Sequence, residues 1–365
     1  MKRTKQTIVN VMAVASVLAL TAAFQGCDGF SVGNDFLEKP PSQDVTKDTV
    51  FSKAEYAERF LWGVYRSLPY LAGEVAGPYD TNLLSGEPQA ALTDLIQSYK
   101  ANGGAYNYYY TGAYTAGTED QYASSTKYNY FDSGSWGGIR RAYIFLENVD
   151  RVPDMDESAK LRLKAEARMI IAVHYTEMFR HYGGMPWVDH AYSPSEDFNL
   201  PRLTARATLD SIVTIIDRAI PNLPFALDEL STEAGRFTQA SAMGLKARVL
   251  LFGASPLFNS SQPYMQGEAA NQELVWYGGE DPSLWKNAAD AAKALIDKVE
   301  QTGAYYLLDT GNPRQDFQDA YYDRDSPELL ISTRKRYKAG GMPNNMASLG
   351  GSAVTHNYVQ MFPMA

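Results

Sequence analysis

Residues Lys164–Val188 read KAEARMIIAVHYTEMFRHYGGMPWV, and this stretch says more about the fold than any other. Apolar or small residues recur here at three- and four-residue steps in two adjoining rows: Leu163, Ala167, Ile170, His174 and Met178 in one, and Leu161, Ala165, Ala172, Tyr175 and Phe179 in the other. A surface helix needs only one such row, so the pattern predicts a helix over Ala159–Tyr182 that is packed on two sides. Gly183 and Gly184 predict its end, and Pro186 prevents it from resuming.

The same kind of periodicity predicts five further helices: Lys53–Leu68 with Ser52 as its N-cap, Trp136–Val149, Thr208–Ile220, Thr238–Ala254 and Ser283–Gln301. The last two are rich in alanine or glycine, which allows neighbouring helices to approach closely. Paired helices of this kind are typical of tetratricopeptide-like arrays, although the strict repeat consensus is absent. We therefore predict a mainly α protein, a helical-repeat scaffold with long loop-rich insertions.

The charge of the chain excludes one class of partner. Its 33 basic and 42 acidic residues give a formal net charge of −9. Phosphate binding requires clustered lysine and arginine, and the only long basic run is Arg334–Arg336. We therefore expect no nucleic-acid partner.

The amino end has the features of an export signal. Basic residues at positions 2, 3 and 5 precede the apolar stretch Ile8–Leu20, which is short for a membrane span. Cys27 is the only cysteine, so an intrachain disulfide is impossible, and its position predicts lipid attachment after cleavage behind Gly26. Cleavage near Ala23, leaving a free thiol, is the alternative, because the residues before Cys27 depart from the usual lipidation pattern. We expect three segments: a signal peptide over residues 1–26, a flexible tether over 27–44 and one helical domain over 45–365.

Catalysis and metal binding have little support in the sequence. His174 and His181 share a helix face, but a zinc-binding helix places histidines four residues apart, and here Met178 takes that position. The acidic run Asp154–Ser158 lacks the glycine and glutamate that complete a calcium loop, and its charges suit the start of the following helix. The 42 carboxylates cannot by themselves single out a glycosidase pair. We expect no catalytic residue, no metal and no cofactor.

Aromatic residues carry the stronger functional signal. Nine tyrosines fall in the 32 positions Tyr99–Tyr130, where 25 tyrosines in 365 residues predict about two. Glycines interrupt this segment, which favours a loop or irregular strand. A tyrosine ring can pack on the C–H face of a sugar while its hydroxyl forms hydrogen bonds, although a loop packed on the helices or a protein interface would also use tyrosine. The candidate ligand contacts are Tyr79, Tyr106, Tyr108, Trp276 and Tyr277.

Lys164–Val188 also resembles the signature helix of the SusD/RagB family of outer-membrane nutrient-binding lipoproteins. The matching positions are Ala165, Glu166, Ala167, Arg168, Ala172, Tyr175, Tyr182, Gly183 and Pro186. Three other segments resemble the family in order along the chain: Phe36–Leu68, Ser283–Leu308 and a short expected strand around Glu328. The final NYVQMFPMA resembles a mid-chain stretch of the family, so the C-terminal part of the family fold is expected to be missing.

The resemblance implies a role as well as a fold. It implies a lipid-anchored protein of the outer membrane and cell surface that binds an oligosaccharide or polysaccharide without catalysis. The ligand would pass to a SusC-like TonB-dependent transporter. A peptide- or protein-binding helical-repeat lipoprotein and a helical glycoside hydrolase are the alternatives. The resemblance carries no individual ligand-binding residue across, because loops change the ligand while the scaffold stays.

Overall fold

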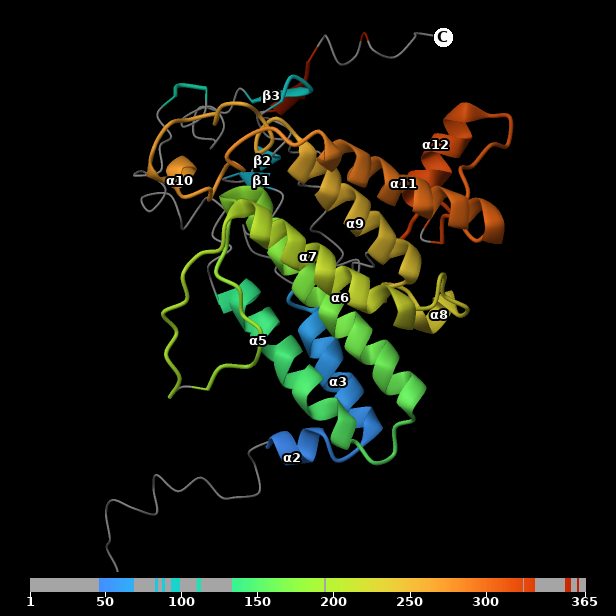
Figure 1. Ribbon diagram of the computed structural model, residues 1–365. Coiled ribbons are helices and arrows are strands. Elements are labelled where there is room, and N and C mark those ends of the chain that lie inside the picture. Colours follow the sequence, from blue (N-terminus) through green and yellow to red (C-terminus); the bar gives the residue numbers. More distant parts are fainter. Residues whose placement is uncertain are drawn as a thin grey trace, which may run out of the picture. The chain divides into compact units, whose positions relative to one another are not determined.

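The computed structural model describes residues 46–68, 83–84, 87–88, 93–98, 110–112, 133–331 except 194 and 324, 352–355, and 360 (Figure 1). The chain forms two units, 1–49 and 50–365. The described end of the first unit lies in the short helix α2 (Lys47–Val50), where the Thr46 hydroxyl oxygen accepts a hydrogen bond from the Thr49 N–H at 3.2 Å. Cys27 and the expected boundaries at residues 26 and 44 lie outside the described residues.

The second unit is mainly helical, as predicted. Its longer helices are α3 (Ala54–Tyr65), α5 (Ser133–Asn148), α6 (Glu157–Tyr182), α7 (Ala205–Ala219), α9 (Gln239–Ala254), α11 (Ser283–Thr302) and α12 (Pro313–Tyr322). Single turns are η3 (Val149–Arg151), η4 (Ile220–Asn222), α8 (Leu230–Glu233) and α10 (Glu268–Asn271). Two antiparallel pairs complete the described elements: β1 (Leu83–Leu84) with β2 (Glu87–Pro88), and β3 (Ile96–Ser98) with β4 (Ser352–Val354).

Helix α6 lies at the centre of the helical packing. It contacts α5, α7 and α3, while α9 packs against α7 and α11 (Figure 1). Every residue of Ala165–Phe179 except Arg168 is buried, so the predicted burial of α6 on more than one face is confirmed. Helix α7 has a single apolar row facing this core, headed by Leu209, Ile212 and Ile216. The sequence of contacts from α3 to α11 is that of a layered helical array.

Several predicted helix ends are displaced by local hydrogen bonds. Helix α7 begins at Ala205, before the expected Thr208, because the Thr204 hydroxyl oxygen accepts from the Ala207 N–H at 3.1 Å. Thr238, expected as the first residue of α9, is its N-cap and forms a capping box with Ser241. The prediction of Ser52 as the N-cap of α3 was wrong, since Lys53 occupies that position without a side-chain cap.

Two elements near the end of the helical unit were predicted wrongly. Helix α12 was not expected; Asn312 caps it, with Pro313 as its first residue. The expected strand around Glu328 is instead a turn. The Glu328 carboxylate accepts a hydrogen bond from the Leu308 N–H at 2.9 Å, so this side chain fixes the connection between α11 and α12.

The Gly183–Gly184 pair ends α6 where two other backbone segments approach it. Gly183 has a φ of 75°, and a Cβ there would lie 2.1 Å from the Leu274 carbonyl oxygen. A Cβ on Gly184 would lie 2.0 Å from the Leu203 carbonyl oxygen. The glycines were predicted to stop a helix, and the structure shows that they also allow the α6–α7 and α10–α11 connections to meet.

Gly184→Ala is expected to lower the free energy of unfolding by about 2–3 kcal/mol, because the new methyl group would overlap backbone rather than a movable side chain. Urea denaturation followed by helical circular dichroism measures the loss. Gly279→Ala is the matched control, since a Cβ there meets nothing within 4 Å. Equal stability of both variants would show that the two ends of the α6–α7 connection do not need this close approach at Gly184.

Candidate functional site

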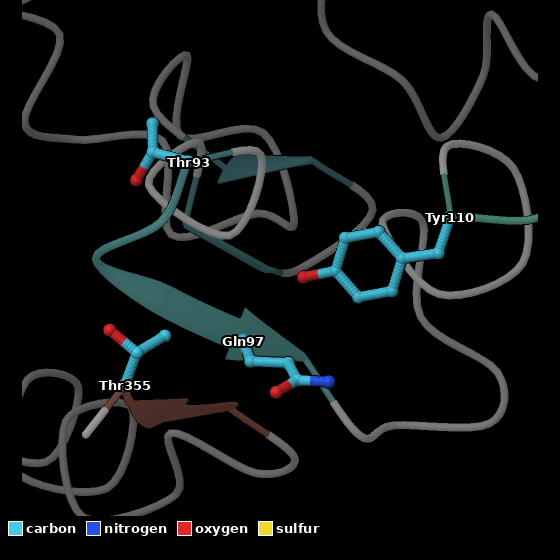
Figure 2. Close-up of a pocket in the computed structure, with 4 residues that line it drawn as sticks. All are labelled: Thr93, Gln97, Tyr110 and Thr355. Atoms are coloured by element: carbon cyan, nitrogen blue, oxygen red, sulfur yellow. The ribbon is translucent and has the colours of Figure 1, made fainter. Parts of the chain in front are cut away.

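A shallow pocket of about 390 Å³ lies beside the β3–β4 pair (Figure 2). Among the described residues, Thr93, Gln97, Tyr110 and Thr355 line it. Figure 2 shows the Tyr110 ring extending from its own segment toward the strand that carries Gln97, with Thr93 and Thr355 near the other end of that strand. The pocket thus brings together two neighbouring segments, at Thr93–Gln97 and at Tyr110, with Thr355, which is far from both in the chain.

Backbone pairing places these side chains together. Strand β3 pairs with β4 in the register Ile96↔Val354, and the Thr355 N–H continues the pairing by donating to the Leu95 carbonyl at 2.9 Å. The Thr355 hydroxyl donates to the Asp94 carbonyl. Just before β3, the Thr93 hydroxyl oxygen accepts a hydrogen bond from the Leu95 N–H at 3.2 Å.

The chemistry of the pocket suits a neutral, hydroxyl-rich ligand. The four lining side chains that the structure describes are uncharged, and their hydroxyl and amide groups can both donate and accept hydrogen bonds. Tyr110 is 41% exposed, so part of its ring is available as an apolar surface. An aromatic face beside uncharged polar groups is a combination that can bind a sugar ring.

Three of the tyrosines predicted to contact a ligand, Tyr79, Tyr106 and Tyr108, lie outside the described residues, so their role stays a prediction. Tyr110 belongs to the same tyrosine-rich segment but was not singled out, because nothing in the sequence distinguishes it from eight neighbours. The turn at Tyr110–Gly112, where Gly112 has a φ of 66°, is the local signal that could have marked it.

Trp276 and Tyr277 contact the scaffold. The Trp276 Nε1–H donates to the Ser260 carbonyl at 2.7 Å, and the Tyr277 ring stacks on Phe258 with centroids 5.7 Å apart. The Tyr277 hydroxyl is buried without a hydrogen-bond partner among the described residues, and burial raises its pKa. Arg206 lies over the same ring, 6.0 Å from its centroid. These contacts give both residues a packing role, and ligand binding by them stays a prediction.

A cluster of charged side chains surrounds the buried Glu166, between α3, α6 and α8. Oε1 of Glu166, on α6, accepts from Nε and Nη2 of Arg236 at 3.0 and 2.6 Å. Its Oε2 accepts from the Tyr65 hydroxyl at 2.9 Å, and Nε of Arg162 lies 3.3 Å from Oε1. Glu233 pairs with both arginines at 2.8 Å. Burial raises the pKa of the Glu166 carboxyl while the guanidinium of Arg236 lowers it. This cluster joins α3, α6 and α8 and has no exposed face at Glu166.

The two histidines of α6 belong to the scaffold, as expected from their spacing. Nε2 of His174 lies 2.9 Å from the Ser67 hydroxyl, which itself donates to the Val64 carbonyl, so the serine accepts from the imidazole. Nδ1 has no hydrogen-bond partner among the described residues, and burial lowers the His174 pKa to about 4. Burial also lowers the pKa of His181, whose Nδ1–H donates to the Glu177 carbonyl at 2.7 Å. Within the described ranges, no three His, Cys, Asp or Glu side chains are grouped as metal ligands would be.

No helix in the described part of the chain is long and apolar enough to cross a membrane. In comparisons with known proteins, residues 35–251, more than half of the chain, match the model of a SusD-like family described as starch-binding and associating with the outer membrane. No curated protein sequence matches significantly.

Solved structures share the fold at low sequence identity. A SusD homologue from Bacteroides thetaiotaomicron has 20% identity and a TM-score of 0.57 over 86% of this chain and 63% of its own. A SusD superfamily protein from Bacteroides vulgatus has 18% identity and a TM-score of 0.57 with the same coverage, 86% and 63%. A SusD-like protein from Bacteroides fragilis has 18% identity and a TM-score of 0.56 over 80% of this chain and 47% of its own. The chain thus spans about half to two-thirds of the length of these three structures.

Proposed function

Because this chain belongs to the SusD-like family of outer-membrane-associated starch-binding proteins, we propose that it binds a neutral glycan and performs no catalysis on it. The observation that carries the proposal is the pocket at the β3–β4 pair, where an exposed tyrosine ring adjoins three uncharged polar side chains. A formal net charge of −9 also disfavours an anionic polysaccharide as ligand, since like charges repel on approach.

The proposal includes a place in the cell envelope. Lipid attached to Cys27 would anchor the protein at the outer membrane and cell surface, and a SusC-like TonB-dependent transporter would receive the glycan. The family match supports association with the outer membrane. The export signal and the position of the only cysteine support the anchor. Mass spectrometry of Cys27 in protein extracted from membranes tests it directly, because lipidation adds a diacylglyceryl mass to the new amino terminus.

Tyr110→Ala is expected to weaken glycan binding roughly five- to tenfold, since it removes the apolar face on which a sugar would pack. Affinity electrophoresis in gels containing amylopectin, laminarin, xylan or galactomannan identifies the ligand, and isothermal titration then measures the change in Kd. Tyr110→Phe keeps the ring and should retain most of the affinity.

Tyr264→Ala is the matched control, because Tyr264 is 84% exposed and does not line the pocket. Binding that is unchanged in Tyr110→Ala would exclude this pocket as the site, and the absence of binding to every glycan would overturn the proposed function. Incubation of each glycan with the protein should release no reducing ends; release would favour a hydrolase.

A further inference from the structure

The connection between α6 and α7 is a closed loop that projects from the helices (Figure 1). Its two arms meet in an isolated bridge between Pro186 and Arg202, and the Leu203 N–H donates to the Met185 carbonyl at 3.0 Å. The Arg202 guanidinium closes the base further by donating to the carbonyls of Tyr182 and Gly184 at 2.6 and 2.7 Å. A loop with adjoining ends and packed side chains holds a defined conformation despite its length.

The described part of this loop carries a stack of three aromatic side chains. The rings of His190 and Tyr192 are stacked with centroids 4.0 Å apart and an interplanar angle of 23°. Tyr192 also contacts Phe198, with ring centroids 5.2 Å apart and an interplanar angle of 37°. Phe198 is 59% exposed at the end of the stack, so its ring offers an apolar surface to solvent. An exposed phenylalanine supported by two further rings has little function in the packing of the core.

Hydrogen bonds fix the stack in place. His190 lies between Asp189 and Glu196, with Nδ1 and Nε2 at 2.6 and 3.1 Å from the two carboxylates. Helix α5 holds the backbone on both sides of Tyr192: Oε1 of Glu147 accepts from the Ala191 N–H at 2.8 Å, and Arg140 donates to the Tyr192 carbonyl at 3.3 Å. The aromatic surface is therefore organised before any ligand arrives, which lowers the entropy cost of binding.

The charges around the stack favour an uncharged ligand. Asp189 and Glu196 are already bonded to His190, and these bonds raise the pKa of the imidazole. A cationic ligand would compete with His190 for these two carboxylates. An anionic ligand would be repelled by these carboxylates and by the neighbouring Asp197. A neutral sugar ring can pack on Phe198 without either cost.

We propose that the described parts of this loop, Asp189–Ser193 and Ser195–Leu200, form a second carbohydrate contact, in which a sugar unit of a bound polysaccharide packs on Phe198. The inference rests on the proposed glycan-binding function and adds a contact outside the β3–β4 pocket, since none of these residues lines that pocket. His190 and Tyr192 are positioning residues that hold the phenyl ring, and the carboxylates at the edge of the stack can accept hydrogen bonds from sugar hydroxyls.

Phe198→Ala is expected to weaken binding of the selected polysaccharide about fivefold, as measured by isothermal titration or affinity electrophoresis. Phe317→Ala is the matched control, because Phe317 is a phenylalanine on α12 that is 75% exposed. Equal thermal unfolding of the two variants and the native protein shows that the fold is intact. Hydroxyl-radical labelling of Phe198, but not of Phe317, should decrease when the polysaccharide is bound.

The possible results separate this inference from the proposed function. If the native protein binds none of the four glycans, the proposed function fails. If it binds one and Phe198→Ala binds equally well, with labelling of Phe198 unchanged, the proposed function stands and the second contact is overturned. A loss of affinity in Phe198→Ala alone, with protection of Phe198, supports the second contact.

Discussion

Replacement of Glu166 by alanine should lower the free energy of unfolding by about 3–5 kcal/mol, the largest effect expected of any single substitution considered for this protein. The carboxylate is fully buried, and its removal takes away one of the two carboxylates that Arg236 and Arg162 share, so that only Glu233 remains for both guanidinium groups. It also leaves the Tyr65 hydroxyl without the acceptor that lies 2.9 Å away. Loss of a buried carboxylate leaves excess positive charge and unpaired N–H and O–H groups in the core, so the loss exceeds that of an exposed salt bridge several-fold.

Urea denaturation followed by circular dichroism measures the change in the free energy of unfolding, and two further variants serve as controls. Asp290→Ala breaks the exposed Lys286–Asp290 pair on α11 and should cost less than about 1 kcal/mol. The double variant Glu166→Met/Arg236→Met removes both charges and should be more stable than Glu166→Ala. A loss below about 1 kcal/mol in Glu166→Ala would show that water reaches this cluster and solvates the arginines.

Acidification should destabilise the protein through His174. The folded state holds this imidazole neutral, with a pKa of about 4 compared with 6.5 for the ordinary side chain. Between these two values the unfolded chain binds a proton that the folded protein excludes, so stability is fully present above pH 6.5 and falls as the pH decreases toward 4. The contribution of this group over that range is about 3 kcal/mol.

His174→Gln removes the titrating group and can still donate a hydrogen bond to Ser67. The free energy of unfolding, measured by urea titration at several pH values from 7 to 4.5, should decrease less steeply in this variant than in the native protein. His190→Gln is the control: the His190 side chain is 42% exposed and its pKa is raised by Asp189 and Glu196, so its removal should not flatten the decrease. Parallel curves for the native protein and His174→Gln would show that His174 becomes protonated without unfolding.

Much of the helical scaffold could be predicted because its signals are local. The two rows of α6 predicted a helix packed on more than one side, and the structure buries nearly all of Ala165–Phe179. Helix ends were less accurate, because a single hydroxyl decides them. Helix α7 begins directly after Thr204 and not at the expected Thr208, since the Thr204 hydroxyl oxygen accepts from the N–H three residues later.

For the candidate site, the sequence could predict the class of ligand but not the residues that contact it. A tyrosine-rich segment indicated a sugar, but among the described residues the structure selected Tyr110, which was not among the candidates. Trp276 and Tyr277 have the same aromatic character in the sequence, yet their contacts with Ser260 and Phe258 place them in the packing of the scaffold. The exposed stack that ends at Phe198 was not anticipated, because its residues follow no helix or strand period.

By itself, the sequence determined the helical class, the centrality of α6, the stop at Gly183–Gly184 and the family, because these depend on residue periods, glycine conformation and motifs within one segment. Only the tertiary structure decided which groups meet. Glu166 pairs with Arg236 seventy positions away, and Tyr110 shares a pocket with Thr355. Contacts of this range require loops to close and whole helices to pack, and the free energy of that packing is spread over many residues of the chain. No local pattern therefore records them.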